Sequence, residues 1–522
     1  MKIKIMGLII VGIFLVSLNA TAVSLTQDSA VQNIDDFYEF FDENKMIFSN
    51  GEKTDFDPLV DINITVTIKE IRALDRIDFL GKPDFYVRVY VDDMMHQSKV
   101  WKNKEIVNAN WPTTFNVDDT VEIHNISIEL WDDNPLRDRI CDLDDNYDYF
   151  QEAKTIELSY SIKTGHWTGD DFTSPYPSWE DYSGYGRANG CDDNTIYQSD
   201  RDCVLTFDIT QNDADGDGIP WWTEDEVYKT DPLVDNRGED FDEDGVPIEW
   251  EHKWGNSLRQ RGNEGKWFYY WIYDPNTYEN HNTLDDDRDG LSNYEEYLVS
   301  EWGSDPFRKD IFVEVDQMEE GPDDEPSSIL TQLTKDTLCA PFHKQNIVLH
   351  LDDGCMGGGN WLPFEKLTDR DRLVELYNEH FLQGNPNHWR KGVFHYGMVV
   401  YDGTYRGFAF GTDDDYHGAF QISSSLIDKR KIIDTPRRTA QVYASVYMHE
   451  LGHTLDIQIP GGHDDESKYI WQLNWWRWRP YKSCMNYGYT YGLIDYSDGS
   501  RGRNDHDDWG TLDLEYFQFE VE

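Results

Sequence analysis

The chain has 522 residues, too many for a single hydrophobic core, so we expect about two to four domains. Its formal net charge at pH 7 is −55, from 101 aspartates and glutamates against 46 lysines and arginines. Because such a charge repels phosphate groups, it argues against nucleic acids and anionic membranes as direct electrostatic partners. Carboxylates in this excess also repel one another unless cations bind them. A solvated acidic surface, without bound cations, is the alternative explanation of this charge.

The first 22 residues have the pattern of a secretory signal peptide: two lysines, a short apolar run and the small residues Ala20-Thr21-Ala22. The apolar run is short for a bilayer span, although an uncleaved membrane anchor is the rival interpretation. We therefore expect cleavage after about Ala22 and a protein that is secreted, extracellular or held at the cell surface. Residues 23–60 are acidic and lack clear periodicity, so we interpret them as a linker or a pro-segment.

Six cysteines in an exported chain predict disulfide bonds. The pairs Cys191–Cys203 and Cys339–Cys355 are close enough in sequence to form, and the other two cysteines have no obvious partner. The sequence does not fix the connectivity, because six cysteines allow many pairings.

Residues 61–211 contain stretches in which apolar and polar residues alternate, the pattern of half-buried β-strands. The alternation is clear over residues 62–68, 85–91 and 126–130. We expect these strands to form an antiparallel β-sandwich, with one face of each sheet turned toward the core.

Two acidic stretches lie between these strands and are predicted to be facing loops at one end of the sandwich. Asp78–Val87 and Trp131–Asn134 resemble the first and third calcium loops of C2 domains. Facing acidic loops bind hard cations through oxygen ligands. The resemblance implies a C2-like domain in which Asn134 stands where the family has an aspartate. Solvated loops without calcium are the alternative, and these residues do not support membrane binding. The candidate ligands are Asp78, Asp84, Asp132, Asn134 and Asp138.

Residues 212–309 contain three copies of one acidic pattern. In each copy, aspartates occupy positions 1, 3 and 5, a glycine position 6 and a glutamate position 12. This pattern resembles the EF-hand calcium loop, where the glycine allows the turn and the last glutamate binds through both oxygens. The flanks are too short for paired EF-hand lobes and resemble thrombospondin-type repeats, so we interpret the segment as a calcium-rigidified spacer. The candidate calcium ligands are Asp213, Asp215, Asp217, Glu224, Asp240, Asp242, Asp244, Glu251, Asp285, Asp287, Asp289 and Glu296.

Residues 310–522 are expected to form a domain that mixes helices and strands. Apolar runs predict strands over residues 311–315, 346–351 and 394–400, and a helix over residues 328–337. Residues 418–422 are expected to form an edge strand shortly before the next helix. The domain therefore opens with a βαβ unit, continues with further strands and then reaches a long helix.

That helix is predicted over residues 439–455, after a capping residue in Asp434-Thr435 and a proline, Pro436, for its first turn. It carries the sequence His449-Glu450-Leu451-Gly452-His453. Histidines four residues apart lie on one face of a helix, so both can bind one zinc ion. The glutamate between them is placed to take a proton from water. This five-residue pattern also occurs by chance in ordinary helices, so the rest of the domain has to support it.

The stretch Ser483–Tyr487 resembles the methionine turn of metzincin metallopeptidases. In that family the order of elements is the one expected here, with the zinc helix following a βαβ opening. The resemblance implies that Met485 lies beneath the zinc site without binding the metal. It also implies that Tyr487 binds the metal or the transition state. For each residue alone, a role in core packing is the alternative.

The third zinc ligand departs from the metzincin pattern. Asp456 and Ile459 stand where the family has a glycine and the ligand, and an isoleucine cannot bind zinc. Asp456 tolerates a left-handed backbone better than most residues, so it can still end the helix. The flexible stretch Pro460-Gly461-Gly462 then leads to His463, our choice for the third ligand, with Asp464 as the next candidate. The alternative is an altered site in which His463 is an ordinary loop residue.

These features together predict a secreted, calcium-stabilised zinc endopeptidase that hydrolyses proteins or peptides. Zinc would be the catalytic cofactor and several calcium ions the structural ones. Glu450 would act as general base and then as proton donor, and Tyr487 would donate to the developing oxyanion. The tryptophan-rich stretch Trp471–Tyr481 would help to wall the substrate cleft, with core packing as the alternative.

The competing function is a non-enzymatic, calcium-dependent surface or adhesion protein with a degenerate peptidase domain. The displaced third ligand favours this alternative. The retention of Glu450 counts against it, because a binding module needs no general base.

Overall fold

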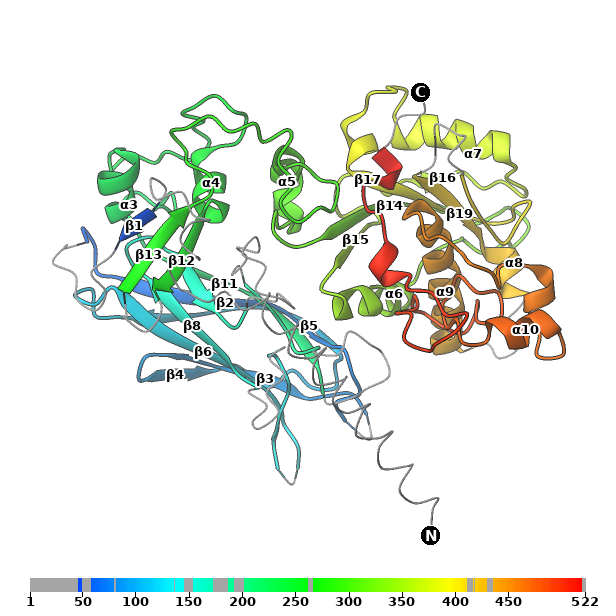
Figure 1. The fold of residues 1–522 in the computed structure, drawn as a ribbon, viewed down its shortest axis with the longest axis horizontal. Coiled ribbons are helices and arrows are strands. Elements are labelled where there is room, and N and C mark those ends of the chain that lie inside the picture. Colours follow the sequence, from blue (N-terminus) through cyan, green and yellow to red (C-terminus); the bar gives the residue numbers. More distant parts are fainter. Residues whose placement is uncertain are drawn as a thin grey trace, which may run out of the picture.

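The computed structural model describes residues 46–48, 58–78, 81–135, 137–144, 154–171, 186–191, 201–261, 266–410, 416, 418–429 and 435–518. The expected signal peptide and most of the expected linker lie outside these residues. No helix in the described part of the chain is long and apolar enough to cross a membrane. Figure 1 shows a sandwich of strands and a mixed domain of helices and strands side by side, with α5 (Asn293–Val299) between them.

The strands of residues 61–211 form a two-sheet antiparallel sandwich, as predicted. The buried side chains alternate along each long strand, so the two inner faces meet in one core of aliphatic and aromatic residues. One sheet has the order β10 (Arg187–Asn189), β11 (Cys203–Gln211), β2 (Asn63–Ala73), β5 (Ile106–Asn116). The other has the order β4 (Met94–Gln97), β3 (Phe85–Val91), β6 (Ile123–Asp132), β8 (Ile156–Ser161), β9 (Trp167–Gly169), and β7 (Arg139–Ile140) pairs with β6.

The alternation of apolar and polar residues over 62–68, 85–91 and 126–130 correctly predicted the strands β2, β3 and β6. Strand β5 was missed because it has few apolar residues and contains Pro112. A proline cannot donate to a neighbouring strand, and β5 is accordingly the edge strand of its sheet.

The six cysteines, all within the described residues, are free thiols, so both predicted disulfide pairs are wrong. Cys203 lies beside Cys141 in the sandwich core, and their thiols are within hydrogen-bonding reach. Cys191 instead lies 3.9 Å from the Lys344 ammonium. The Cys339 thiol donates to the Leu349 carbonyl at 3.5 Å, which turns it away from Cys355.

A short helical turn follows each of the three acidic loops of the spacer, and within residues 201–261 and 266–309 no helix directly precedes a loop. This bears out the expectation that the spacer lacks paired EF-hand lobes. The turns are α3 (Trp221–Thr223) with the π-helical turn Glu224–Tyr228, α4 (Ile248–Trp254) and α5.

A three-stranded sheet that the sequence does not reveal combines two strands from between the second and third loops with one strand from far upstream. Its order is β1 (Met46–Phe48), β13 (Lys266–Trp271), β12 (Asn256–Arg261). The interpretation of residues 23–60 as a linker or a pro-segment did not include this strand at residues 46–48, which pairs with β13 of the spacer. Three residues are too few for their periodicity to be recognised.

The C-terminal domain has a largely parallel sheet covered by helices on both faces. The strand order is β15 (Val348–Asp352), β14 (Asp310–Met318), β17 (Phe394–Val400), β19 (Ala419–Ser423), β18 (Gly407–Ala409), and β16 (Trp361–Leu362) pairs with β14. Helices α6 (Gln332–Lys344) and α9 (Pro436–Thr454) pack together on one face. Helix α7 (Arg370–Leu376) packs on the other face.

The structure contains the strands and helices predicted for this domain, but two of the predictions need correction. Residues 418–422 do not form the sheet edge, because β19 lies between β17 and β18. The edge is β18, which the sequence analysis missed and which runs antiparallel to β19. The helix expected from residue 328 starts at Gln332, because Ser328 bridges to Met318 and Thr331 caps the helix by accepting from Thr334 N.

The end of α6 contacts the sandwich through a buried ion pair and a hydrogen bond. The Lys344 ammonium is 3.0 Å from Asp75 and 3.5 Å from Asp202, and its side chain is 3% exposed. Next to it, Asn189 Nδ2 donates to the His343 carbonyl at 2.9 Å. A buried cation between two carboxylates is thus shared by the two domains.

We predict that Lys344→Ala lowers the free energy of unfolding by about 3–5 kcal/mol, because it leaves buried carboxylates without their cation. Lys69→Ala is the matched control. Lys69 is 3.0 Å from Asp208 but its side chain is 49% exposed, so its loss should cost less than about 0.5 kcal/mol. Urea unfolding followed by tryptophan fluorescence measures both. Equal effects of the two substitutions would contradict the docking role of Lys344.

Candidate metal centres

Helix α9 places two of the three histidines and begins and ends as its sequence predicts. Thr435 accepts a hydrogen bond from Arg438 N, and Pro436 occupies the first turn. The helix ends at Thr454, and Asp456 then adopts a left-handed backbone with φ 49°. The middle of the helix is buried on the sheet, so His449 and His453 are held on rigid backbone.

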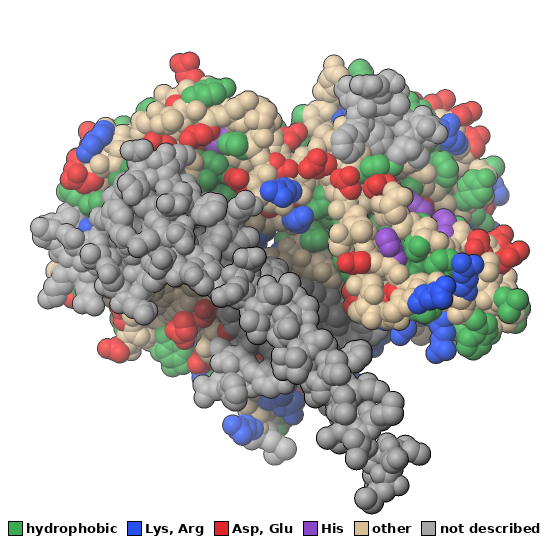
Figure 2. All heavy atoms as spheres, viewed as in Figure 1, with side chains coloured by type: hydrophobic (Ala, Val, Ile, Leu, Met, Phe, Trp, Pro, Cys, Tyr) green, Lys and Arg blue, Asp and Glu red, His purple; other side chains and the backbone are tan. Residues whose placement is uncertain are grey.

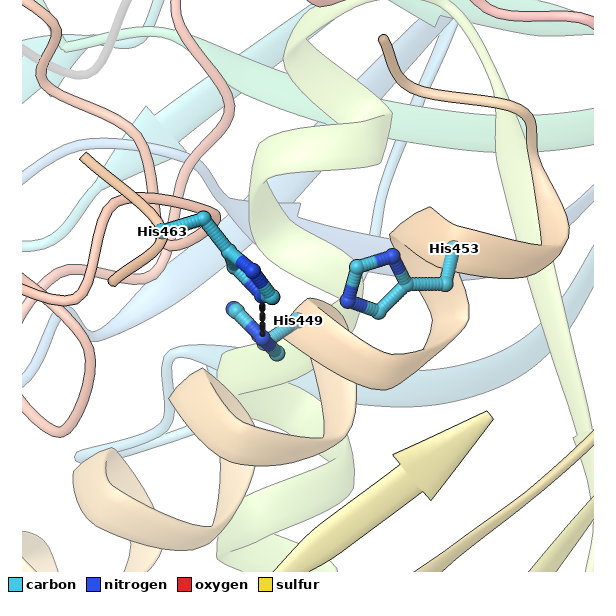
Figure 3. Close-up of side chains that lie close together, drawn as sticks. All are labelled: His449, His453 and His463. Atoms are coloured by element: carbon cyan, nitrogen blue, oxygen red, sulfur yellow. Dashed lines mark hydrogen bonds between the residues drawn. The ribbon is translucent and has the colours of Figure 1, made fainter. Parts of the chain in front are cut away.

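Three imidazoles converge, His449 and His453 from successive turns of α9 and His463 from the following loop (Figure 3). One ring nitrogen of each lies within 4.8 Å of the other two. His449 Nε2 and His463 Nε2 are 3.1 Å apart. His449 Nδ1 lies 2.8 Å from the Cys484 carbonyl, to which it can only donate, so its Nε2 presents a lone pair.

Burial keeps these rings neutral, which is the form that binds a metal. The pKa of His449 is well below its usual value because the ring is buried and faces the other two histidines. Burial likewise lowers the pKa of His453 and of His463 to about 4. Three neutral imidazoles whose nitrogens face one point form a donor set that fits a zinc ion.

His463 reaches this point because two glycines allow the loop to turn sharply. Gly461 and Gly462 have φ values of 156° and 90°. A Cβ on Gly461 would lie 2.1 Å from the Trp478 ring, so no larger residue fits there. Tyr487 N donates to the Gly462 carbonyl at 3.0 Å and ties this turn to the methionine turn. Ile459, at the position of the usual third ligand, packs against the core instead.

Glu450 lies beside the histidines at the wall of a cleft of about 450 Å³, which His449 and Tyr487 also line. Burial raises its pKa to about 8. Its carboxylate rests on Gly407 of the edge strand β18, where a Cβ would lie 2.0 Å from Glu450 Oε1. The role of Gly407 is not visible in the sequence, because a single glycine in a three-residue strand carries no recognisable signal.

Met485 and Tyr487 lie below and beside the histidines. A Cβ on Gly452 of α9 would meet Met485 Sδ at 2.7 Å, so the buried methionine packs directly under the helix. The Tyr487 ring centroid is 4.2 Å from that of His463. Burial, followed by the charge of Glu450, raises the pKa of Tyr487 to about 12, so its hydroxyl keeps its proton. Met485 thus lies beneath α9 and Tyr487 beside His463, and their roles at a zinc ion stay predictions.

The tryptophan-rich stretch Trp471–Tyr481 does not line the cleft, so that prediction is wrong. Its central part forms α10 (Leu473–Trp478), in which no residue is buried, and Trp471 is 75% exposed. Lysine and arginine side chains gather with hydrophobic ones at the lower right of Figure 2, where Figure 1 places α10. Trp478 supports the site indirectly, because it packs against the Gly461 turn.

The three acidic loops of the spacer share one geometry. In each, the glycine at position 6 has a positive φ and its N–H donates to the first aspartate at 3.0–3.1 Å. The donor and acceptor pairs are Gly218 and Asp213, Gly245 and Asp240, and Gly290 and Asp285. The aspartates at positions 1, 3 and 5 of each loop form a cluster of carboxylates.

Other carboxylate oxygens of these loops and of the turns that follow them have no hydrogen-bond donor. Both oxygens of Asp242, Glu251 and Glu296 are buried and have no hydrogen-bond partner. Burial, followed by the charges of the loop aspartates, raises the pKa of Glu224 to about 8 and of Glu251 to about 10. Oxygen donors of this kind fit calcium, whose binding here stays a prediction.

The acidic loops of the sandwich also meet. Asp84 N donates to Asp132 Oδ1 at 2.9 Å, and Asn134 Nδ2 donates to Asp132 Oδ2 at 2.5 Å. Burial and the neighbouring Asp132 raise the pKa of Asp78. Asp138 is less available as a calcium ligand, because its carboxylate accepts hydrogen bonds from Tyr86 OH at 3.0 Å and from Asn134 N at 3.3 Å. The set of predicted ligands is therefore brought together, with Asp138 committed to the sandwich.

Residues 63–142 match the family of C2 domains, so this part of the chain is a C2 domain, in agreement with the sandwich and its acidic loops. No curated protein matches the chain. Human GIVD cytosolic phospholipase A2 with methyl gamma-linolenyl fluorophosphonate is 14% identical and has a TM-score of 0.18, covering 32% of this chain and 18% of its own. This chain thus spans less than a fifth of that protein. A C2 domain of plant extended synaptotagmin 1 is 10% identical and has a TM-score of 0.19, covering 30% of this chain and 97% of its own.

We predict that chelating calcium lowers the Tm of the full chain by several degrees or more, and by more at pH 8 than at pH 5. Without a cation, Glu224 and Glu251 have folded-state pKa values of about 8 and about 10, above those of the unfolded chain. Such groups stabilise the fold below their unfolded pKa, and this stabilisation is lost as the pH rises through the folded value. Calorimetry with and without a chelator measures the effect. A Tm independent of calcium would refute the structural role of the loops.

Proposed function

We propose that the chain is a secreted, calcium-stabilised zinc endopeptidase of the metzincin type. The observation that carries this proposal is the convergence of His449, His453 and His463 next to a cleft that His449 and Glu450 line. The methionine turn beneath α9 supports the same assignment. Secretion rests on the pattern of the first 22 residues.

The three histidines would hold the zinc ion, each through the ring nitrogen that faces the other two rings. Zinc in such a site supplies a positive charge that polarises a carbonyl group and makes water more acidic. The Cys484 carbonyl fixes the orientation of His449, and the glycine turn fixes His463. Both supports are part of the rigid backbone around the methionine turn.

Glu450 would accept a proton from the attacking water and pass it to the leaving amine of the cleaved bond. Its position against Gly407 holds the carboxylate at the cleft wall. The Tyr487 hydroxyl, which keeps its proton, would donate a hydrogen bond to the oxyanion that develops on the substrate carbonyl.

The edge strand β18 suggests how a substrate would bind. It ends the sheet, reaches the cleft at its first residue, Gly407, and there lies next to Glu450. An extended peptide that adds to a sheet edge gains main-chain hydrogen bonds along its length. We therefore propose unfolded or extended protein segments as substrates.

The first test replaces the proposed general base. Glu450→Gln should lower kcat for cleavage of an unfolded protein about 10²- to 10⁴-fold while the bound zinc is retained, because the amide cannot accept the proton. The exposed Glu320→Gln is the matched control and should leave kcat unchanged. Full activity of Glu450→Gln would refute the mechanism. An inactive wild-type chain that binds no zinc at the three histidines would instead favour the adhesion function.

The second test displaces the Glu450 side chain by a substitution at a neighbouring residue. Gly407→Ala should lower kcat at least about tenfold with zinc content unchanged, because the added Cβ would lie 2.0 Å from Glu450 Oε1 and would displace the carboxylate. Gly492→Ala is the matched control, since its Cβ would make only an ordinary contact of 3.5 Å. Equal activity of the two variants would show that the placement of Glu450 by β18 does not matter.

A further inference from the structure

A second group of metal-ligating side chains lies in the spacer, away from the three histidines of α9. Asp244 and Glu251 belong to the second acidic loop and its helix α4, whereas Glu279 and His281 come from the segment before the third loop. Each offers one ligand atom, and the four atoms lie within 4.8 Å of one another. His281 Nε2 is 3.1 Å from Asp244 Oδ2 and 3.8 Å from Glu251 Oε1.

Two members of this group are buried with donor atoms that make no hydrogen bond. Glu251 is 1% exposed and His281 is fully buried. Both carboxylate oxygens of Glu251 and the Nε2 of His281 lack a hydrogen-bond partner, although they lie in the same small space. Buried polar atoms left in this way cost free energy unless a ligand occupies the space between them.

The ring of His281 is fixed in place by its surroundings. Asn293 Nδ2 contacts its Nδ1 at 3.1 Å, and the rings of Trp250 and Tyr273 meet it edge-on at centroid distances of 5.7 and 5.1 Å. These contacts leave Nε2 directed at the carboxylates. The amide oxygen of Asn293 is buried without a hydrogen-bond partner. With the amide turned so that this oxygen accepts from Nδ1–H, the Nε2 presents a lone pair, as in metal-binding histidines.

The composition of this group differs from that of the calcium loop next to it. The loop cluster Asp240, Asp242 and Asp244 offers only oxygen atoms, which suit calcium. An imidazole together with carboxylates suits zinc and related transition metals instead. The separations of 3.1 and 3.8 Å are close to the ligand–ligand distances, about 3–3.6 Å, that zinc bonds of about 2.0–2.2 Å produce.

We propose that Asp244, Glu251, Glu279 and His281 form a structural site for a divalent transition metal such as zinc. This metal lies beside the calcium of the second loop and shares Asp244 and Glu251 with it. It joins that loop to the segment leading into the third loop, so it fixes the spacer between the two domains. The proposal does not depend on the site at α9.

The experiment measures zinc bound to the full-length chain in saturating calcium, after removal of free metal. His453→Ala removes a proposed ligand at α9, and His281→Ala removes one in the spacer. We expect each substitution to abolish one equivalent of bound zinc and to leave the other equivalent in place. Loss of one zinc equivalent in His453→Ala tests the α9 site, and loss of one in His281→Ala tests the spacer site. The failure of one proposal can therefore be told from the failure of the other.

Two further measurements cover the case in which His281→Ala does not fold. In the His453→Ala protein, X-ray absorption at the zinc edge should show one imidazole nitrogen among oxygen ligands at about 2.0–2.2 Å. Glu279→Gln, which keeps the side-chain shape, should weaken zinc binding in that protein at least about tenfold. Three results would overturn the proposal. They are two zinc equivalents retained in His281→Ala, no zinc bound to His453→Ala, and a zinc shell made of oxygen atoms alone.

Discussion

Ionisable side chains that are buried without an opposite charge destabilise a fold, and this chain buries such groups in several clusters. At α9 three imidazoles are held neutral by burial, and in the spacer carboxylates are held next to one another at raised pKa values. A bound cation would offset the cost in both places. Under this proposal, part of the acidic excess that gives the chain its net charge of −55 serves as cation ligands.

The arrangement of the domains depends on the same pairing of buried charges. Lys344, at the end of α6, neutralises two buried carboxylates of the C2 domain and its surrounding sandwich. Helix α6 also packs against α9, so the helix that carries the histidines rests on the element that contacts the sandwich. In Figure 1 most of the spacer lies over the sandwich, and its helix α5 lies between the sandwich and the C-terminal domain. Cations that stiffen the spacer would thus support the position of the cleft.

Much of this structure could be predicted from the sequence because the relevant patterns are local. The residues of α9, the acidic loops and the glycine turn before His463 all specify their own conformation, and Asp456 adopts the left-handed backbone that its side chain tolerates. Strands β1 and β18 could not be predicted, because three residues show no periodicity and their pairing is set by distant strands. For the same reason the contact of Gly407 with Glu450 was not predictable, nor was the partnership of His281 with Glu251.

The most direct test of the proposed function is to locate zinc by anomalous scattering in crystals of the full chain grown with zinc and calcium. An anomalous peak at the zinc absorption edge, in contact with His449, His453 and His463, is the predicted result. A well-ordered structure in which these three imidazoles contact no metal would contradict it.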